Sequence, residues 1–250
     1  MDPTNPTDQT DQTENTTPLT SASAVDQGAA VLIRGMDLDV FNAAKGGKTD
    51  VLRAHGPSLD QILTPTKNTV LHIYTAFASS PTLVEPKENA LKPTRVVKDI
   101  LQICPALLLQ ENESGETALH IAARHGRTDI VKLLIRTARA RPRDLERGFS
   151  PEEDLKMFLR ATNKEKDTAL HEAARFNQLG VAEILSREDP DFSYSANNAG
   201  ETPLYLAAER RYRDVFYKIL NTCNNPTYEG PIGRTALHAA VIYGKESIQS

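Results

Sequence analysis

The chain has no tryptophan, only two cysteines and no long apolar run among its 250 residues. Cys104 and Cys223 are too few and too far apart to form a disulfide scaffold or a zinc site, so we expect two buried free thiols. No apolar run reaches the roughly 18 residues that a membrane-spanning helix needs. The N-terminus also lacks the basic start and apolar core of a secretory signal, which argues against export.

An excess of basic residues is absent as well. The chain has 33 acids and 29 bases, for a net charge of −4, whereas nucleic-acid-binding proteins usually carry a basic excess. It contains no glycine-rich phosphate loop, no paired-carboxylate signature and no catalytic motif around either cysteine. The sequence therefore predicts no enzyme, no cofactor or metal site and no nucleic-acid partner.

What the chain does contain is a repeated motif. Its best copy reads GETALHIAARHG at Gly115–Gly126, and equivalent threonines follow at spacings of 51, 34 and 33 residues. The repeated positions are Thr117, Leu119, His120, Thr168, Leu170, His171, Thr202, Leu204, Thr235, Leu237 and His238. This motif and period resemble those of ankyrin repeats, which implies an all-α ankyrin-repeat solenoid of helix-turn-helix units joined by β-hairpin-like loops.

Each repeated residue type has an expected structural role. The threonine begins the first helix of a unit, where its hydroxyl can satisfy a free backbone group. The leucine is buried between units. The histidine bonds threonine or backbone within and between units, since one histidine per repeat fits neither catalysis nor a metal site. Gly126 and Asn177 can adopt the left-handed conformation that ends the first helix, and Arg211 does so less easily.

We divide the chain into a leader rich in Thr, Asp and Gln at 1–35 and an ankyrin-repeat domain at 36–250. The expected units are 36–66, 67–111, 112–162, 163–196, 197–229 and 230–250, of which the last is incomplete. The second unit has Tyr74 and Thr75 where the third has Ala122 and Ala123, so we expect weaker stacking there. The leader is too polar to fold, and it is either a plain solvated arm or a phosphorylated regulatory one.

The third unit carries an insertion at 136–162. Five arginines lie in twelve residues, Arg136–Arg147, and the following Ser150-Pro151 with its acids predicts a helix start. Leu155, Phe158 and Leu159 would then face the array. The arginines are open to three interpretations, which are a solvated helix end, weak contact with anionic lipid headgroups or an acidic partner, and contact with RNA.

Three stretches resemble one group of ankyrin proteins more closely. They read GETPLYLAA at 200–208, NK followed by TALHEAA at 163–174, and GPIGRTALHAAV at 230–241. They resemble plant ankyrin proteins of the accelerated-cell-death type over about 36–250. The resemblance implies further repeats, a C-terminal domain of several membrane spans, and links to plant defence, salicylic-acid responses, cell death and salt stress.

The expected function is protein–protein recognition by a scaffold. By the resemblance, the chain is the cytosolic ankyrin part of a membrane protein in plant defence or stress signalling, on the cytosolic face of the plasma membrane or an internal membrane. Membrane attachment would come from a C-terminal region outside the chain, or weakly from Arg136–Arg147. The alternatives are a soluble cytoplasmic adaptor and the ankyrin module of a longer enzyme such as a kinase or ubiquitin ligase.

Partners of ankyrin proteins usually meet the hairpin tips and the exposed end of each first helix. These positions are Glu113, Ser114, Glu116, Arg124, His125, Lys164, Glu165, Arg175, Phe176, Asn198, Glu209, Arg210 and Tyr243. Phe176 and Tyr243 are the expected anchors, because aromatic side chains contribute strongly to interface energetics. The alternative is that both rings pack against the next unit.

Overall fold

A computed structural model describes residues 34–78, 92–141 and 150–244 of the chain. Most of the predicted leader, Arg143 and Arg147 of the insertion, and the last residues of the sixth unit lie outside these ranges. The described residues all lie in one compact unit. The strand found in these ranges is one short parallel pair, β1 (Arg34–Gly35) with β2 (Ile62–Leu63), and an isolated bridge joins Glu229 and Thr235.

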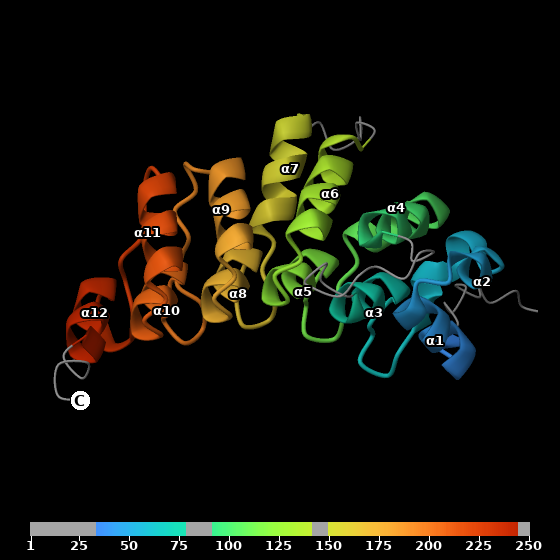
Figure 1. Cartoon of the computed structure of the whole chain (residues 1–250), viewed down its shortest axis with the longest axis horizontal. Coiled ribbons are helices and arrows are strands. Elements are labelled where there is room, and N and C mark those ends of the chain that lie inside the picture. The colour runs from blue at the N-terminus through green and yellow to red at the C-terminus, as the bar shows by residue number, and fades with distance from the viewer. Residues whose placement is uncertain (1–33, 79–91, 142–149, 245–250) are drawn as a thin grey trace, which may run out of the picture. The chain divides into compact units, whose positions relative to one another are not determined.

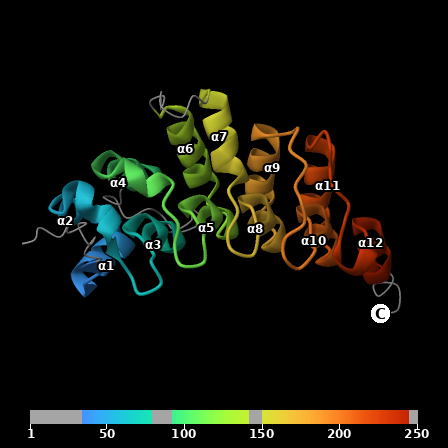
Figure 2. The same cartoon turned by 180° about the vertical axis from the view of Figure 1, so that it is seen from behind.

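The described helices form two rows, as Figures 1 and 2 show from opposite sides. The inner row contains the first helix of each unit: α1 (Leu38–Gly46), α3 (Val70–Phe77), α5 (Ala118–Arg124), α8 (Ala169–Arg175), α10 (Pro203–Glu209) and α12 (Ala236–Gly244). The outer row contains α2 (Thr49–Arg53), α4 (Pro93–Ile103), α6 (Thr128–Arg139), α7 (Pro151–Arg160), α9 (Leu179–Glu188) and α11 (Arg213–Thr222). Short 3₁₀ turns, η1 (Gly56–Gln61), η2 (Pro105–Leu108) and η3 (Pro231–Gly233), join some of them. This arrangement is the all-α solenoid that the sequence predicts.

The Thr–His pairs organise the start of the inner helices, as predicted. In α5, the Thr117 backbone N–H donates to His120 Nδ1 at 3.2 Å, and the Thr117 hydroxyl lies 3.0 Å from the same nitrogen. Because Nδ1 accepts, the proton is on Nε2, which donates to the Asp167 carbonyl of the next unit at 3.1 Å. His72 makes the equivalent bond to the Glu116 carbonyl at 2.8 Å, so His72 and His120 each join two units.

The inner helices also end as the sequence predicts. Gly126, Asn177 and Arg211 all adopt positive φ, at 65°, 57° and 61°, immediately after the helix. Glycine adopts this conformation at no steric cost, whereas Arg211 does so against its own side chain. The reversal sends the chain back along the inner helix as the outer helix.

The insertion in the third unit supplies one further helix to the outer row. Ser150 caps α7 by accepting from the Glu153 backbone N–H, and the Glu153 side chain accepts from the Ser150 backbone. Leu155, Phe158 and Leu159 are buried and α7 packs on α6, as expected from the sequence. Burial of each large apolar side chain contributes about 1.5–3 kcal/mol, which holds this otherwise polar segment on the array.

The second unit accommodates its large residues without leaving them exposed. Tyr74 and Thr75 are both buried, in positions that hold alanine in the third unit. The Tyr74 ring lies where a Cβ on Gly47 would come within 2.9 Å of it, so the missing side chain of Gly47 provides the space. The large side chain of Tyr74 is thus accommodated by a glycine in the preceding unit, and weaker stacking of the second unit stays a prediction.

One leucine of the repeat differs from the prediction. Leu119, Leu170 and Leu204 are 1% exposed, whereas Leu237 is 70% exposed. The inner helices α5, α8 and α10 each lie between two others, but α12 has α10 as its neighbour on one side only within the described residues. The expected burial of the repeat leucine therefore fails in the sixth unit.

Hairpin tips connect the units along one edge. The side-chain oxygens of Asn112, Asn163 and Asn197 each accept from two backbone N–H groups of their own tip. Neighbouring tips are joined by backbone bonds of 2.9 Å, such as the one that Lys164 donates to Ser114. This repeated bonding fixes the tips relative to the inner helices, and the tips and helices together frame a groove.

Candidate functional site

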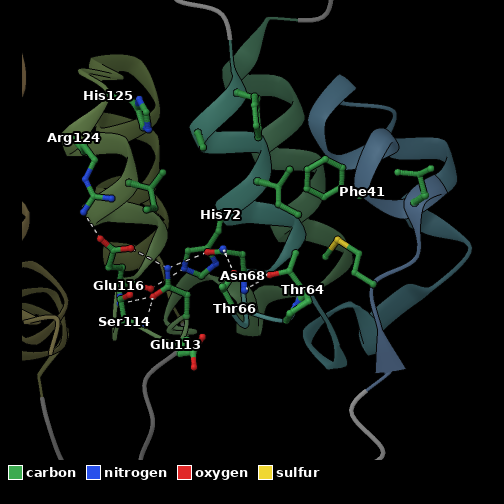
Figure 3. Close-up of a pocket in the computed structure, with 18 of the residues that line it drawn as sticks. Phe41, Thr64, Thr66, Asn68, His72, Glu113, Ser114, Glu116, Arg124 and His125 are labelled. Carbon is green, nitrogen blue, oxygen red and sulfur yellow. Dashed lines mark hydrogen bonds and ion pairs between the residues drawn. The ribbon is translucent and has the colours of Figure 1, made fainter.

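A groove of about 850 Å³ lies across the first three units of the described residues. Its walls are α1, α3 and α5 together with the segments 64–68 and 112–116, and we call it the N-terminal groove. Figure 3 shows Phe41 toward one end, Arg124 and His125 toward the other, and the hairpin side chains between them. It is lined by Met36, Asp37, Leu38, Phe41, Thr64, Pro65, Thr66, Asn68, His72, Ile73, Ala76, Phe77, Asn112, Glu113, Ser114, Glu116, Ile121, Arg124 and His125.

One end of the groove is apolar and open. Leu38 is 71% exposed and Phe77 is 49% exposed, while Phe41 is half-buried. The rings of Phe41 and Phe77 meet edge to face with centroids 6.4 Å apart, and Lys45 Nζ lies 4.6 Å from the Phe77 centroid. The two rings therefore hold each other in place while part of Phe77 remains available for contact.

The middle of the groove is polar and internally bonded. Asn68 donates from its backbone to the Thr64 hydroxyl at 2.9 Å and from its side chain to Thr66 at the same distance. Asn112 donates its side-chain amide to Asn68 at 3.0 Å and to Glu116 at 2.9 Å. Because these bonds occupy the side chains, the surface is preformed and a ligand would meet it with little loss of side-chain entropy.

The far end of the groove contains an ion pair between Arg124 and Glu116. Burial alone would raise the pKa of Glu116, but the hydrogen bond from Asn112 and the nearby charge of Arg124 hold that pKa below its ordinary value. Burial and the charges of Arg127 and Arg124 lower the pKa of the neighbouring His125. Glu116 is therefore ionised and His125 neutral near pH 7.

The same ion pair begins a ladder of buried charges through three units. Arg124 Nε also donates to Glu172 of the fourth unit at 2.7 Å. Arg175 bonds Asp167 at 2.7 Å and Glu172 at 3.0 Å, and it reaches Glu201 of the fifth unit at 3.5 Å. We call these residues the Arg–acid ladder, and it consists of Glu116, Arg124, Asp167, Glu172, Arg175 and Glu201.

The structure brings the five predicted contact residues of the third unit together in the N-terminal groove. Glu113, Ser114 and His125 are exposed there, whereas Glu116 is buried and Arg124 half-buried, because these two form the ion pair. Arg175 is likewise half-buried in the ladder. Glu113, Ser114 and His125 are thus open to a partner, and their role in binding stays a prediction, while Glu116, Arg124 and Arg175 form ion pairs within the array.

The other predicted contact residues lie on later units. Lys164, Glu165, Asn198 and Arg210 are exposed, and Glu209 is half-buried. Phe176 is 45% exposed, with the Arg124 guanidinium 5.8 Å from its ring centroid. Tyr243 belongs to α12, but its side chain lies outside the described part of the chain. The role of Phe176 and Tyr243 as anchors stays a prediction.

Sequence reasoning missed the apolar end of the groove. Phe77 stands eight residues after Thr69, the same register that Phe176 has after Thr168 and Tyr243 after Thr235. The register was thus a readable signal for Phe77. Leu38 had no such signal, because the first unit lacks the threonine that sets the register.

Metal binding and cysteine reactivity are the other chemistry to consider in the described residues. No three His, Cys, Asp or Glu side chains within the described ranges lie close enough together to hold a metal ion. Cys104 and Cys223 are buried and unpaired, as expected. Burial raises the pKa of both thiols, to about 11 for Cys223, so both stay protonated near pH 7 and are poor nucleophiles.

The arginine-rich insertion is partly described. Arg136, Arg139 and Arg141 are exposed, and Arg139 pairs with Glu188 at 2.6 Å. At the end of α7, Arg160 donates two bonds to Asp189, at 2.6 Å and 2.9 Å. Two of these arginines therefore join the third unit to the fourth. No helix in the described ranges is long and apolar enough to span a bilayer.

Comparison with known proteins agrees with the repeat pattern. A family model described as ankyrin repeats in three copies matches residues 89–195 and 150–229. Protein ACCELERATED CELL DEATH 6 of Arabidopsis thaliana is 26% identical over 195 residues, which are 76% of this chain and 27% of that protein.

Two animal proteins match a shorter stretch. Neurogenic locus notch homolog protein 1 of Homo sapiens is 28% identical over 145 residues, and that of Danio rerio is 30% identical over 146 residues. Both matches cover 58% of this chain and 5% of the relative. The chain thus spans about a quarter of the plant relative and a small part of the animal ones.

Proposed function

Because the chain belongs to the ankyrin-repeat family, whose repeats imply a protein–protein interaction module, we propose that its N-terminal groove binds another protein. Ankyrin repeats are typically non-enzymatic, and the protonated, buried thiols give no reason to depart from that. The observation that carries the proposal is the open apolar end of the groove. Leu38 and Phe77 are large, exposed apolar side chains that line the same groove, and association gains most from burying such side chains.

The test is capture of partners by the chain and by matched variants. Leu38→Ser together with Phe77→Ser removes the apolar end of the groove, and Met157→Ser removes an exposed apolar side chain from α7 in the outer row. We expect the wild type and Met157→Ser to capture a partner that the groove variant does not capture. The melting temperature of each variant shows whether its fold is intact. The captured partner is then purified and titrated directly. Equal retention by all three chains would contradict the proposal.

We further propose that the chain is the cytosolic ankyrin part of a plant membrane protein in defence, cell-death or stress signalling. Support comes from the three sequence stretches that resemble the accelerated-cell-death type and from the 26% identity over 76% of the chain. On this proposal, membrane attachment belongs to a region of the protein other than the described residues, with at most a weak contribution from Arg136–Arg147.

The sequence of the full-length transcript tests this second proposal. Further repeats and several apolar runs of about 20 residues downstream of Ser250 would support it. A kinase or ligase motif downstream would instead make the chain the recognition module of an enzyme. A stop codon directly after Ser250 would favour an adaptor without membrane attachment, and none of these results affects the proposal for the groove.

A further inference from the structure

The N-terminal groove has an excess of negative charge. Asp37, Glu113, Glu116 and Arg124 are its charged lining residues, which gives the lining a net charge of −2, and Lys45 lies outside the lining against the Phe77 ring. Arg124 is already bonded to Glu116 and to Glu172, so its charge is fully used within the array. Asp37 caps α1 through the Val40 backbone N–H at 2.8 Å. Within the described residues, neither Asp37 nor Glu113 has an ion-pair partner, so no cationic side chain neutralises either carboxylate.

One of these carboxylates lies beside the apolar end of the groove, and the other lies farther along. Asp37 is adjacent in sequence to Leu38, the most exposed apolar residue of the groove, and both come from the start of α1. Glu113 lies at the tip of the third unit, beside the polar middle of the groove. A ligand that filled the groove would therefore meet an apolar surface with one carboxylate beside it and a second carboxylate farther along.

The size of the groove fits a segment of polypeptide. About 850 Å³ spread over three units is near the upper limit for small-molecule sites, and the lining is fixed by internal hydrogen bonds. Electrostatic complementarity then selects for the sign of the charge on that segment.

The chain's own remaining segments have the wrong charge to fill the groove. Residues 1–33 contain five acids and no lysine or arginine, and residues 79–91 contain two acids and one lysine. Residues 142–149 contain two acids and two arginines, and residues 245–250 contain one acid and one lysine. None of the four segments carries a net positive charge. Complementarity therefore favours a separate partner.

We propose that the partner presents a short basic segment with an aromatic or leucine anchor. The anchor packs on Leu38 and the exposed part of Phe77, and lysine or arginine side chains pair with Asp37 and Glu113. This inference rests on the proposed function of the groove and specifies the chemistry of what binds there.

The first experiment is selection of a random peptide library on the immobilised full chain. We expect enrichment of peptides that combine an aromatic or leucine residue with lysine or arginine. Selected peptides are then synthesised with a fluorescent label and titrated at low and high salt. Their affinity should fall as salt rises, because the contacts with Asp37 and Glu113 are exposed to solvent.

Two variants separate the charges from the apolar surface. Asp37→Asn with Glu113→Gln removes both charges, and asparagine still caps α1. We expect about a tenfold loss of affinity at low salt and little salt dependence in what remains. Asp39→Asn with Glu111→Gln is the matched control, since both are exposed acids outside the groove and the net charge changes equally. Leu38→Ser alone should weaken binding by at least about tenfold without disturbing the fold, because this side chain is largely exposed.

The outcomes separate a failure of the inferred basic segment from a failure of the groove as a binding site. Selection of acidic or uncharged peptides that no longer bind the Leu38→Ser variant would overturn the inferred basic segment. The groove would remain the binding site. Basic peptides whose binding survives both groove variants and is lost in Phe176→Ser would move the site to the fourth unit and overturn the inference. Equal losses of affinity in the charge variant of the groove and in its matched control would show a general charge effect and overturn the inference too.

Failure to select any peptide would count against the groove as a peptide-binding surface altogether. Self-association of the chain through the groove, seen as a doubled mass that Leu38→Ser abolishes, would replace the partner by a second copy.

Discussion

At the scale of single residues, the buried histidines are neutral, and His72 and His120 each bond a backbone carbonyl of the next unit. His72, His120 and His171 each accept a hydrogen bond from a threonine backbone through Nδ1, which an added proton would abolish. Burial lowers the pKa of all three, and it lowers that of His171 to about 4. His171 differs from the other two because its buried Nε2 has no hydrogen-bond partner within the described residues.

These pKa values predict that the fold weakens in mild acid. Since the folded pKa of His171 lies below its ordinary value of 6.5, the neutral ring stabilises the fold fully above about pH 6.5, and this stabilisation is lost as the pH falls toward about 4. The full loss is on the order of 3 kcal/mol. Urea unfolding at about pH 7 and about pH 5 should show a drop that is smaller in His171→Gln. An equal drop in both proteins would contradict the assignment to His171. Asp167 and Arg175 face the same ring, but Asp167 has a lowered pKa and titrates only in stronger acid.

The Arg–acid ladder predicts a second effect at this scale. Glu116 is 7% exposed and Glu172 is 2% exposed, so Arg124→Met would leave two buried carboxylates without one of their partners. Removing one member of a buried pair costs about 3 kcal/mol of unfolding free energy. Arg139→Met is the control, because Arg139 is exposed and its pair with Glu188 should contribute less than about 1 kcal/mol. Urea titrations that gave both variants the same stability would show that the ladder contributes no more than a surface ion pair.

At the scale of the helices, the end of α1 packs against α3 because Gly47 has no side chain at the point where Tyr74 has a large one. Gly47 has a φ of 66°, and a Cβ at this position would lie 2.9 Å from Tyr74 and 3.2 Å from Val96. Gly47→Ala should therefore cost about 2 kcal/mol or more through backbone strain and overlap. Tyr74→Ala removes the overlap, so the double variant should be less destabilised than the sum of the two by about 1 kcal/mol.

The neighbouring glycine provides the control for this cycle. A Cβ on Gly46 would meet only Lys48, at 3.9 Å, and Gly46 is in helical backbone, so Gly46→Ala should be neutral or slightly stabilising. Urea unfolding of all four variants measures the coupling. Strict additivity of Gly47→Ala and Tyr74→Ala would show that the two residues do not depend on each other.

The elements were predictable from sequence to the extent that local signals define them. The Thr-Leu-His motif located α3, α5, α8 and α12, Ser150-Pro151 located α7, and Asn177 marked a reversal, because each acts within a few residues of its own position. The Arg–acid ladder could not be read in the same way. Arg124 reaches Glu172 across 48 residues of sequence, and the repeat position of Glu172 holds Ile121 in one neighbouring unit and Leu206 in the other. Leu38 was likewise out of reach, since no local motif fixed how α1 begins.

At the scale of the whole molecule, the array is held by contacts between neighbours. Inner helices α3, α5, α8 and α10 each pack on the inner helices before and after them, while α1 and α12 each pack on one. Hydrogen bonds, ion pairs and hairpin tips repeat the connection from unit to unit. The N-terminal groove uses only the first three units, while the ladder continues into the fifth. In such an array the stability of one end depends weakly on the other, which lets the groove keep its shape when distant units loosen.

This locality predicts opposite results for two similar substitutions. Leu71 and Leu204 are both buried repeat leucines, 0% and 1% exposed, in the second and fifth units. Replacement by alanine costs about 2–5 kcal/mol at either site, but the loss should stay local. Hydrogen exchange should show Leu204→Ala losing protection in α10, α11 and α12 while α1, α3 and α5 keep theirs, and peptides bound in the groove should keep their affinity. Leu71→Ala should do the reverse, losing protection in α1–α5 together with peptide binding. If either substitution lowered protection evenly from α1 to α12, the array would unfold as a single cooperative unit, and the groove would depend on every repeat rather than on the three that form it.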